Sequence, residues 1–183
     1  MHKDELWQLF DKNGKRKMDG GYPSALGNPK LNSGKIYGVT AIYFYRHGKN
    51  GLELLFQKRG DKVDKYPGKW DVSAGGHINY DEPVEMATCR EAVEEIGAKI
   101  SVSELEFVYS AFRNANSILW LYCVDWTNKE DTFHFDDGEV SEVKWVPYKN
   151  IRAFLDEFAK KPLKEDEVTP KVLDRWFKDR GHC

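Results

Sequence analysis

The pattern of apolar and polar positions along the chain predicts a mixture of strands and helices. Short apolar runs rich in aromatic and β-branched residues are bounded by glycine, asparagine and proline, which is typical of strands. Longer segments with apolar residues at three- and four-residue steps are typical of amphipathic helices. We expect strands over residues 36–45, 52–58, 70–74, 105–113, 118–126 and 140–146, with a short edge strand over 132–135. We expect helices over residues 83–96, 151–160 and 170–178.

The order of these elements predicts an α/β fold in which a mixed sheet lies between helices. Strands and helices do not alternate strictly, and this disfavours a doubly wound parallel sheet. A length of 183 residues suits one domain with a substantial core. We therefore expect an N-terminal strand or arm packed on the core over residues 1–35, a core domain over 36–160 and a C-terminal helix over 161–183.

The segment 83–96 has clear signals for both ends of a helix. Pro83 suits the first helical turn, where its missing N–H has no partner to lose, and Gly97 is a natural stop. The spacing of its apolar residues predicts one buried stripe. Members of that stripe are Met86, Cys89, Val93 and Ile96.

Three glutamates of the same helix, Glu91, Glu94 and Glu95, fall largely off this stripe. Their spacing brings Glu91 beside both of the others, so the three carboxylates repel one another unless a positive charge lies among them. Hard divalent cations such as Mg²⁺ prefer carboxylate oxygens and share them with substrate phosphates. The alternative interpretation is an ordinary solvated helix face.

Residues 76–98 resemble the signature of the Nudix hydrolases. Gly76, Glu82 and the run Arg90-Glu91-x-x-Glu94-Glu95-x-Gly97 occupy its fixed positions, while Ala92 and Ala98 stand where larger aliphatic residues are usual. The resemblance implies a Nudix-type α/β/α sandwich. It also implies Mg²⁺- or Mn²⁺-dependent hydrolysis of a nucleoside diphosphate linked to another group. The metal ligands that it implies are Glu91, Glu94, Glu95 and the carbonyl of Gly76.

Two charged residues of the signature are expected to support the site. The planar fork of Arg90 can hold a neighbouring carboxylate, Glu94 or Glu82, in a ligating orientation. Glu82 begins the helix, where the helix dipole favours a negative charge, so we expect it to support the site first and to bind metal second.

The attacking water needs a base, and the candidates are carboxylates. Glu95 and Glu94 are candidates within the signature. In many relatives a carboxylate from the region before the last strand completes the site, so we favour Glu139, with Glu142 next. An acidic surface turn is the alternative interpretation of this region.

Substrate-binding candidates lie on both sides of the signature. Lys58 and Arg59 end a strand that faces the loop before the signature, and either could hold a phosphate or be an ordinary strand-end charge. His77 has a counterpart that ligates metal in related isomerases, and we weigh a metal or phosphate contact equally against a position at the rim.

One branch of the superfamily resembles this chain most. The segments 55–59, 66–71 and 73–77 are similar to the subgroup related to type I isopentenyl diphosphate isomerases, as is the N-terminal stretch 5–14. Those isomerases need a cysteine two residues before the histidine, and Gly75 occupies that position here. Because glycine cannot exchange a proton and all three signature glutamates are present, hydrolysis leads. An isopentenyl diphosphate isomerase-like enzyme is second, and a non-catalytic nucleotide sensor is third.

Composition and charge limit the kinds of binding partner that we expect. A net charge of −2 gives no electrostatic reason to expect a nucleic acid polymer or an anionic membrane surface. No apolar run approaches the roughly 20 residues of a membrane helix. Three widely spaced cysteines form neither a disulfide framework nor a zinc pattern, so we expect a reducing cytoplasm. We expect a small-molecule diphosphate substrate, and leave a homodimer open beside a monomer.

Overall fold

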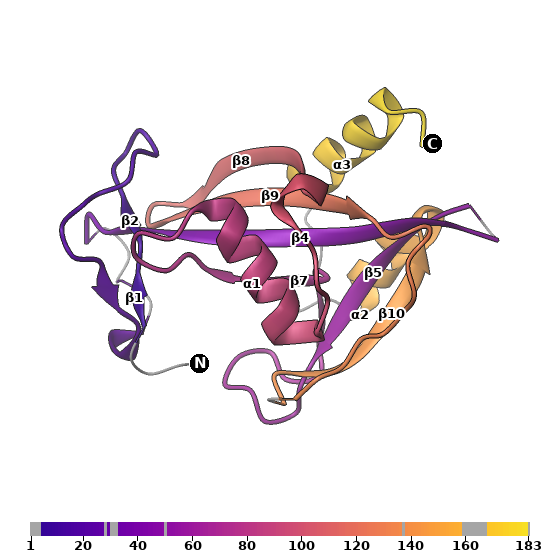
Figure 1. Ribbon diagram of the computed structural model, residues 1–183, viewed down its shortest axis with the longest axis horizontal. Coiled ribbons are helices and arrows are strands. Elements are labelled where there is room, and N and C mark those ends of the chain that lie inside the picture. The colour runs from indigo at the N-terminus through magenta and orange to yellow at the C-terminus, as the bar shows by residue number, and fades with distance from the viewer. Residues whose placement is uncertain are drawn as a thin grey trace.

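The computed structural model describes residues 5–27, 29, 33–49, 51–136, 138–158 and 168–182, and the predicted α/β fold is confirmed within them (Figure 1). The strands are β1 (Leu6–Trp7), β2 (Leu9–Phe10), β3 (Tyr22–Pro23), β4 (Ile36–Gly48), β5 (Gly51–Arg59), β6 (Trp70–Asp71), β7 (Ala74–His77), β8 (Glu106–Asn114), β9 (Ser117–Asp125) and β10 (Val140–Pro147). The helices are α1 (Val84–Ile96), α2 (Ile151–Phe158) and α3 (Val168–Asp179), with short 3-10 turns η1 (Ser24–Leu26), η2 (Val102–Glu104) and η3 (Tyr148–Asn150).

The long strand β4 organises the sheet. The main strand order is β10-β5-β4-β9-β8, and β2, β6 and β7 pair with β4 or β5 beside this path. β4 runs parallel to β9 and antiparallel to β5 and β7, so the sheet is mixed, as predicted. Its pairing with β7 places Gly75 opposite Ala41 and Gly76 opposite Thr40. The double glycine is therefore fixed at the middle of the sheet.

Side chains alternate along β4 and build a core on each face of the sheet. Ile42 and Phe44 belong to the core beneath α1, whereas Tyr43 and Tyr45 belong to the core beneath α2 and α3. Figure 1 shows α1 lying across the face of the sheet turned toward the viewer, with α2 behind the sheet. No helix in the described ranges is both long and apolar enough to cross a membrane.

Helix α1 forms at the predicted place, but its buried face differs from the prediction. Met86 and Val93 are 52% and 42% exposed. The buried residues of the helix are Ala87, Thr88, Ala92, Glu95 and Ile96. The predicted stripe was wrong, except for Ile96, because its larger apolar side chains point away from the sheet. Small residues let the helix approach the sheet closely, and polar ones contact it.

The N-terminal segment is more regular than expected. β1 pairs with β3, and β2 pairs with the first residues of β4. Between β1 and β2, the buried Gln8 donates its backbone N–H to the Ile78 carbonyl (2.8 Å). The side-chain oxygen of Gln8 accepts a hydrogen bond from the Asp81 N–H (3.0 Å). The arm is thus hydrogen-bonded to the segment that joins β7 to α1. The proposed boundaries at residues 35 and 160 stay predictions.

The predicted edge strand over residues 132–135 is wrong. The segment has no regular secondary structure and pairs with no described strand. The His134 N–H donates to the Ile96 carbonyl at the end of α1 (3.2 Å), and Phe133 and Phe135 pack on the core. The apolar pattern came from packing against α1 and not from strand pairing. Residues 159–167, which include the end of the predicted second helix, lie outside the described residues.

Two neighbouring substitutions test the reversed face of α1. Ala92 is fully buried, so Ala92→Leu overpacks the contact with the sheet and should lower the free energy of unfolding by about 1–3 kcal/mol. Val93→Gln, on the exposed side, should change it by no more than about 0.5 kcal/mol. Urea denaturation followed by circular dichroism measures both, and equal losses would contradict this packing.

Candidate active site

The two glycines of β7 allow two close approaches, that of α1 at Gly76 and that of β4 at Gly75. A β-carbon at Gly76 would collide with the carboxylate of Glu91. A β-carbon at Gly75 would stand 2.6 Å from the Thr40 carbonyl oxygen and 3.0 Å from the Ala41 Cα, which are backbone atoms that cannot rotate away. Gly76 is therefore needed for the close approach of α1, and Gly75 is needed for the close pairing of β7 with β4.

Glu95 is the most deeply placed of the signature carboxylates. Its residue is 6% exposed. Its Oε2 accepts the Gly75 N–H at 2.7 Å and the Gln57 Nε2–H at 2.9 Å. Burial raises the pKa of this carboxyl well above its usual range, and the nearby Glu91 adds to the rise. Two buried donors thus hold one oxygen of a group that burial alone would neutralise.

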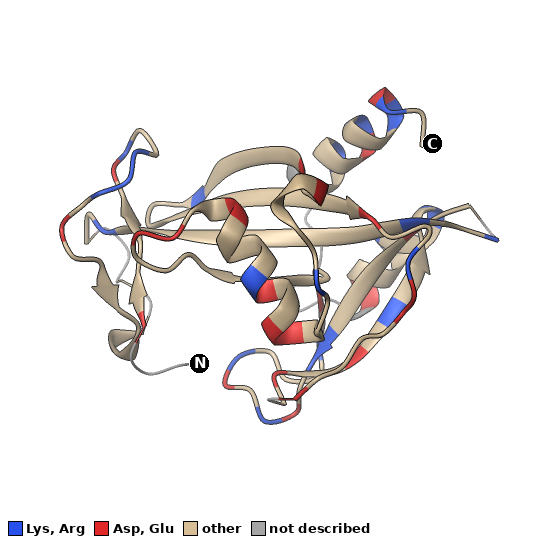
Figure 2. Cartoon of the chain, in the orientation of Figure 1, with Lys and Arg blue, Asp and Glu red and all other residues tan. Residues whose placement is uncertain are grey.

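Arg90 gathers the other carboxylates. Its Nε and one terminal nitrogen bind the two oxygens of Glu82 at 2.9 and 3.1 Å. The other terminal nitrogen donates to Glu91 at 2.9 Å and to Glu94 at 2.8 Å. The His77 carbonyl accepts a further bond at 2.9 Å. Figure 2 shows this single basic position on α1 between acidic ones.

Arg90 contacts both carboxylates named from the sequence, Glu82 and Glu94, and Glu91 is an additional partner, while their orientation toward a metal stays a prediction. Burial disfavours the charged guanidinium, but the hydrogen bond to Glu82 and the nearby carboxylates outweigh it and raise the pKa of Arg90. For Glu91, the effect of burial on the pKa outweighs the effect of the neighbouring charge. Burial raises its pKa to about 7, although Arg90 opposes the rise.

The oxygen donors at the inner face of α1 fit a hard divalent cation. The space that a side chain at Gly76 would fill lies against the Glu91 carboxylate, and neither donor to Glu95 uses its Oε1. In the described part of the chain, however, no three His, Cys, Asp or Glu side chains already converge as a metal site. Arg90 holds Glu91 and Glu94, and Glu94, 40% exposed in its side chain, can turn away most easily.

His77 borders this site and stacks on the N-terminal arm. Its ring lies parallel to the Trp7 indole, with centroids 3.7 Å apart, and Tyr37 packs at 5.3 Å. Burial lowers the pKa of His77 to about 4, and the positive charges of Lys65 and Arg90 contribute. The imidazole is therefore neutral near pH 7. Only the resemblance of the segment around Trp7 to the isomerase branch pointed to a role for this residue.

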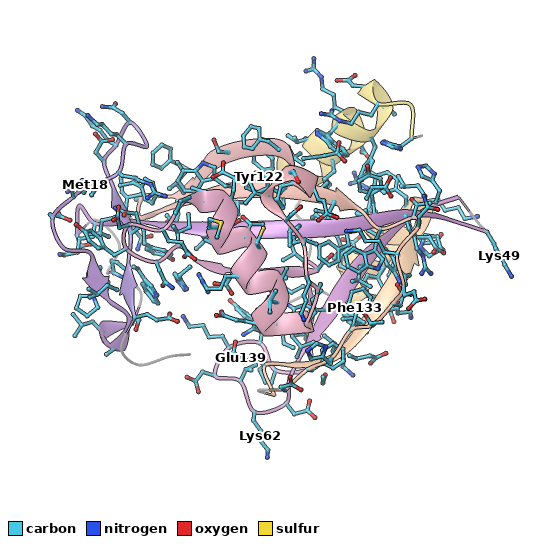
Figure 3. The ribbon with its side chains drawn as sticks, viewed as in Figure 1. Met18, Lys49, Lys62, Tyr122, Phe133 and Glu139 are labelled. Carbon is cyan, nitrogen blue, oxygen red and sulfur yellow. The ribbon has the colours of Figure 1, made fainter. Side chains whose placement is uncertain are left out.

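The remaining candidates lie together at the ends of β5 and β10. Lys58 approaches Glu142 at 3.8 Å, and Arg59 donates from Nε to the Lys65 carbonyl at 2.9 Å. The half-buried Glu139 accepts the Gly60 N–H on its carbonyl at 2.8 Å (Figure 3). Sequence reasoning missed Gln57, whose signal is a lone amide after the apolar run 54–56.

The NUDIX domain model matches residues 35–167, so the chain belongs to the Nudix family. Over 142 residues it is 34% identical to the uncharacterized Nudix hydrolase YfcD of Escherichia coli K12, covering 75% of this chain and 71% of that protein. Nudix hydrolase 3 of Arabidopsis thaliana is 30% identical over 63% of this chain, which spans only 16% of that protein. The predicted family and enzyme class, a Nudix hydrolase, are thereby confirmed.

Two further comparisons bear on the branch and the fold. Isopentenyl-diphosphate Delta-isomerase 2 of Photorhabdus laumondii is 28% identical over 96% of this chain and 89% of that protein. The crystal structure of DR0079 from Deinococcus radiodurans superposes with a TM-score of 0.65 at 19% identity, covering 93% of this chain and 98% of that one. The resemblance to both hydrolases and an isomerase is therefore confirmed.

The hydrogen bonds of Arg90 predict that lysine cannot replace it. Arg90→Lys keeps the charge, but a lysine cannot reproduce the bidentate bond to Glu82 together with the bonds to Glu91 and His77. It should lower the free energy of unfolding by about 2 kcal/mol or more. Lys58→Gln removes only a surface ion pair and should cost less than about 1 kcal/mol. Urea denaturation measures the free energy of unfolding of both variants. An unchanged free energy of unfolding for Arg90→Lys would contradict the role of this network.

Proposed function

We propose that this chain hydrolyses a diphosphate linkage in a nucleoside diphosphate derivative or a related small-molecule diphosphate, with Mg²⁺ or Mn²⁺ at the inner face of α1. The observation that carries the proposal is a pair of carboxylates, the buried Glu95 and the largely buried Glu91, facing the glycine backbone of β7. Burying two carboxylates is costly unless something positive is shared between them. Arg90 reaches Glu91 but makes no hydrogen bond to Glu95 in the described structure.

The residues that would hold the metal are Glu91, Glu94, Glu95 and the carbonyl of Gly76. A bound divalent cation supplies charge neutralisation for diphosphate oxygens and a lower pKa for a bound water. Arg90 and Glu82 support this group, because their bidentate bond fixes the guanidinium between the carboxylates. The chain's own share of the reaction is positioning and the stabilisation of charge.

The base for the attacking water belongs to the same proposal. Glu95 and Glu94 are the candidates on α1, and Glu139 is the candidate from the loop before β10, with Glu142 next. Burial raises the pKa of Glu95, and a higher proton affinity suits a carboxylate that accepts a proton from water. Glu139 lies beside Gly60 at the start of the loop that follows β5.

Lys58, Arg59 and His77 are the proposed substrate contacts. The ion pair of Lys58 with Glu142, at 3.8 Å and partly exposed, costs little to break, so the ammonium can turn to a phosphate. The Nε of Arg59 is used on the Lys65 carbonyl, which leaves its terminal nitrogens for a phosphate. His77, neutral at pH 7, would contribute a hydrogen bond and no charge.

An isomerase of prenyl diphosphates is the second candidate, favoured by the similarity to the Photorhabdus laumondii isomerase along nearly the whole chain. The position that needs a cysteine in those enzymes is Gly75. A β-carbon there would collide with the backbone of Thr40 and Ala41, so the strand pairing itself resists a side chain at this position. This observation favours hydrolysis.

The first prediction of the proposal concerns the metal. The purified chain should release phosphate or a nucleotide from at least one member of a panel of nucleoside diphosphate derivatives, and only with Mg²⁺ or Mn²⁺ present. The reason is that diphosphate oxygens repel the site's carboxylates in the absence of a cation. Activity that survives exhaustive chelation would remove the metal from the mechanism.

The second prediction concerns the carboxylates. Glu95→Gln and Glu94→Gln should each lower kcat by about a hundredfold or more, because each keeps its size and loses the charge that holds the cation. Steady-state kinetics measures the loss, and circular dichroism checks that the fold persists. Near-normal turnover of Glu94→Gln would show that this exposed carboxylate belongs to a solvated face.

The third prediction separates the two candidate reactions. Isopentenyl diphosphate incubated with the chain and Mg²⁺ should yield no dimethylallyl diphosphate, because moving a proton between two carbons needs an acid and a base on opposite sides of the substrate. Gly75 supplies neither. Chromatography of the products tests this, and a robust isomerase rate would overturn the choice of hydrolysis.

A further inference from the structure

Gln57 is a buried amide in an apolar setting. It follows Leu54, Leu55 and Phe56 in β5, all fully buried, and is itself 1% exposed. Side chains alternate along the strand, so Gln57 shares the α1 side of the sheet with Leu55, a member of the core beneath that helix. An apolar side chain would suit this position by pattern alone. The amide therefore calls for a reason other than packing.

Only half of this amide is satisfied. Its Nε2 donates to Glu95 Oε2 at 2.9 Å, whereas its Oε1 is buried and has no hydrogen-bond partner among the described residues. A buried acceptor without a partner destabilises the folded state. The chain thus keeps a polar group that costs stability at a point where it contacts one signature carboxylate.

The contact with Glu95 is specific in its geometry. Gln57 and the Gly75 N–H, from two different strands, both bind Oε2 and neither binds Oε1. Two donors from fixed elements determine the rotation of the carboxylate about its axis. They leave Oε1 as the oxygen available to a ligand.

We propose that Gln57 is a positioning residue that orients the Glu95 carboxylate for metal binding. The inference rests on the proposed metal-dependent function of the same site. Loss of an outer partner that orients a metal ligand commonly weakens metal binding by about ten- to a hundredfold. The role is visible without any substrate, because it acts on the binding of the ion alone.

The test is the affinity of the full chain for Mn²⁺, measured by the loss of the free-ion signal in electron paramagnetic resonance. Gln57→Met has a similar length and no donor, and it should weaken Mn²⁺ binding about tenfold or more. The matched control is Leu55→Met, a volume-conserving change on the same side of β5, which should leave the affinity within about twofold. Equal affinity of Gln57→Met and the unchanged chain would overturn the inference.

A double-mutant cycle with Glu95→Gln separates positioning from a general structural effect. If Gln57 acts through Glu95, adding Gln57→Met to Glu95→Gln should change the Mn²⁺ affinity by less than about twofold. An undiminished effect in that background would contradict the inference. Thermal unfolding identifies folded variants, and Gln57→Asn, which withdraws the amide from Glu95, serves if Gln57→Met does not fold and should weaken binding similarly.

Titration of the unchanged chain with Mn²⁺ separates a failure of the proposed function from a failure of the inference about Gln57. A chain that binds no Mn²⁺ would contradict the proposed function and this inference together. A chain that binds Mn²⁺ equally well with and without the Gln57 amide would contradict this inference alone.

Discussion

The repulsion among the carboxylates of Glu82, Glu91, Glu94 and Glu95 is the constraint on which the site depends. Arg90 offsets part of this repulsion, because its guanidinium binds three of the four carboxylates and also the carbonyl of His77. Glu95 is left to two neutral donors, the Gly75 N–H and Gln57. No positively charged side chain among the described residues binds Glu95. This lack of positive charge beside Glu95 is the physical reason for proposing a cation there.

The close contact of α1 with β7 follows from the same constraint. The Glu91 carboxylate can lie against the strand only if residue 76 carries no side chain, and Gly76 meets this condition. The small residues Ala87 and Ala92 let the helix approach. The long strand β4 holds β7 in place, since it pairs with β7 at its centre and with β9 along most of its length. The fold thus brings the Glu91 and Glu95 carboxylates against the glycine backbone of β7.

The sequence predicted much of this architecture, and its failures have physical causes. Strands and helix ends with strong turn signals, such as Gly97 with φ of +68°, lie where expected. The buried stripe of α1 was wrong because hydrophobic periodicity assumes that large apolar residues face the core, whereas this helix buries Thr88, Glu95 and small alanines. The contacts of Trp7 with His77 and of Gln57 with Glu95 join residues 70 and 38 positions apart. Local patterns carry no signal for such pairs.

The central claim, that a divalent cation binds between α1 and β7, is tested most directly by a crystal structure of the full chain grown with Mn²⁺, with the ion located by its anomalous scattering. The account predicts Mn²⁺ bound directly by oxygens of Glu91 and Glu95 and by the carbonyl of Gly76, with Glu94 turned from Arg90 toward it. Mn²⁺ bound elsewhere, or the two buried carboxylates unchanged with no ion between them, would contradict it.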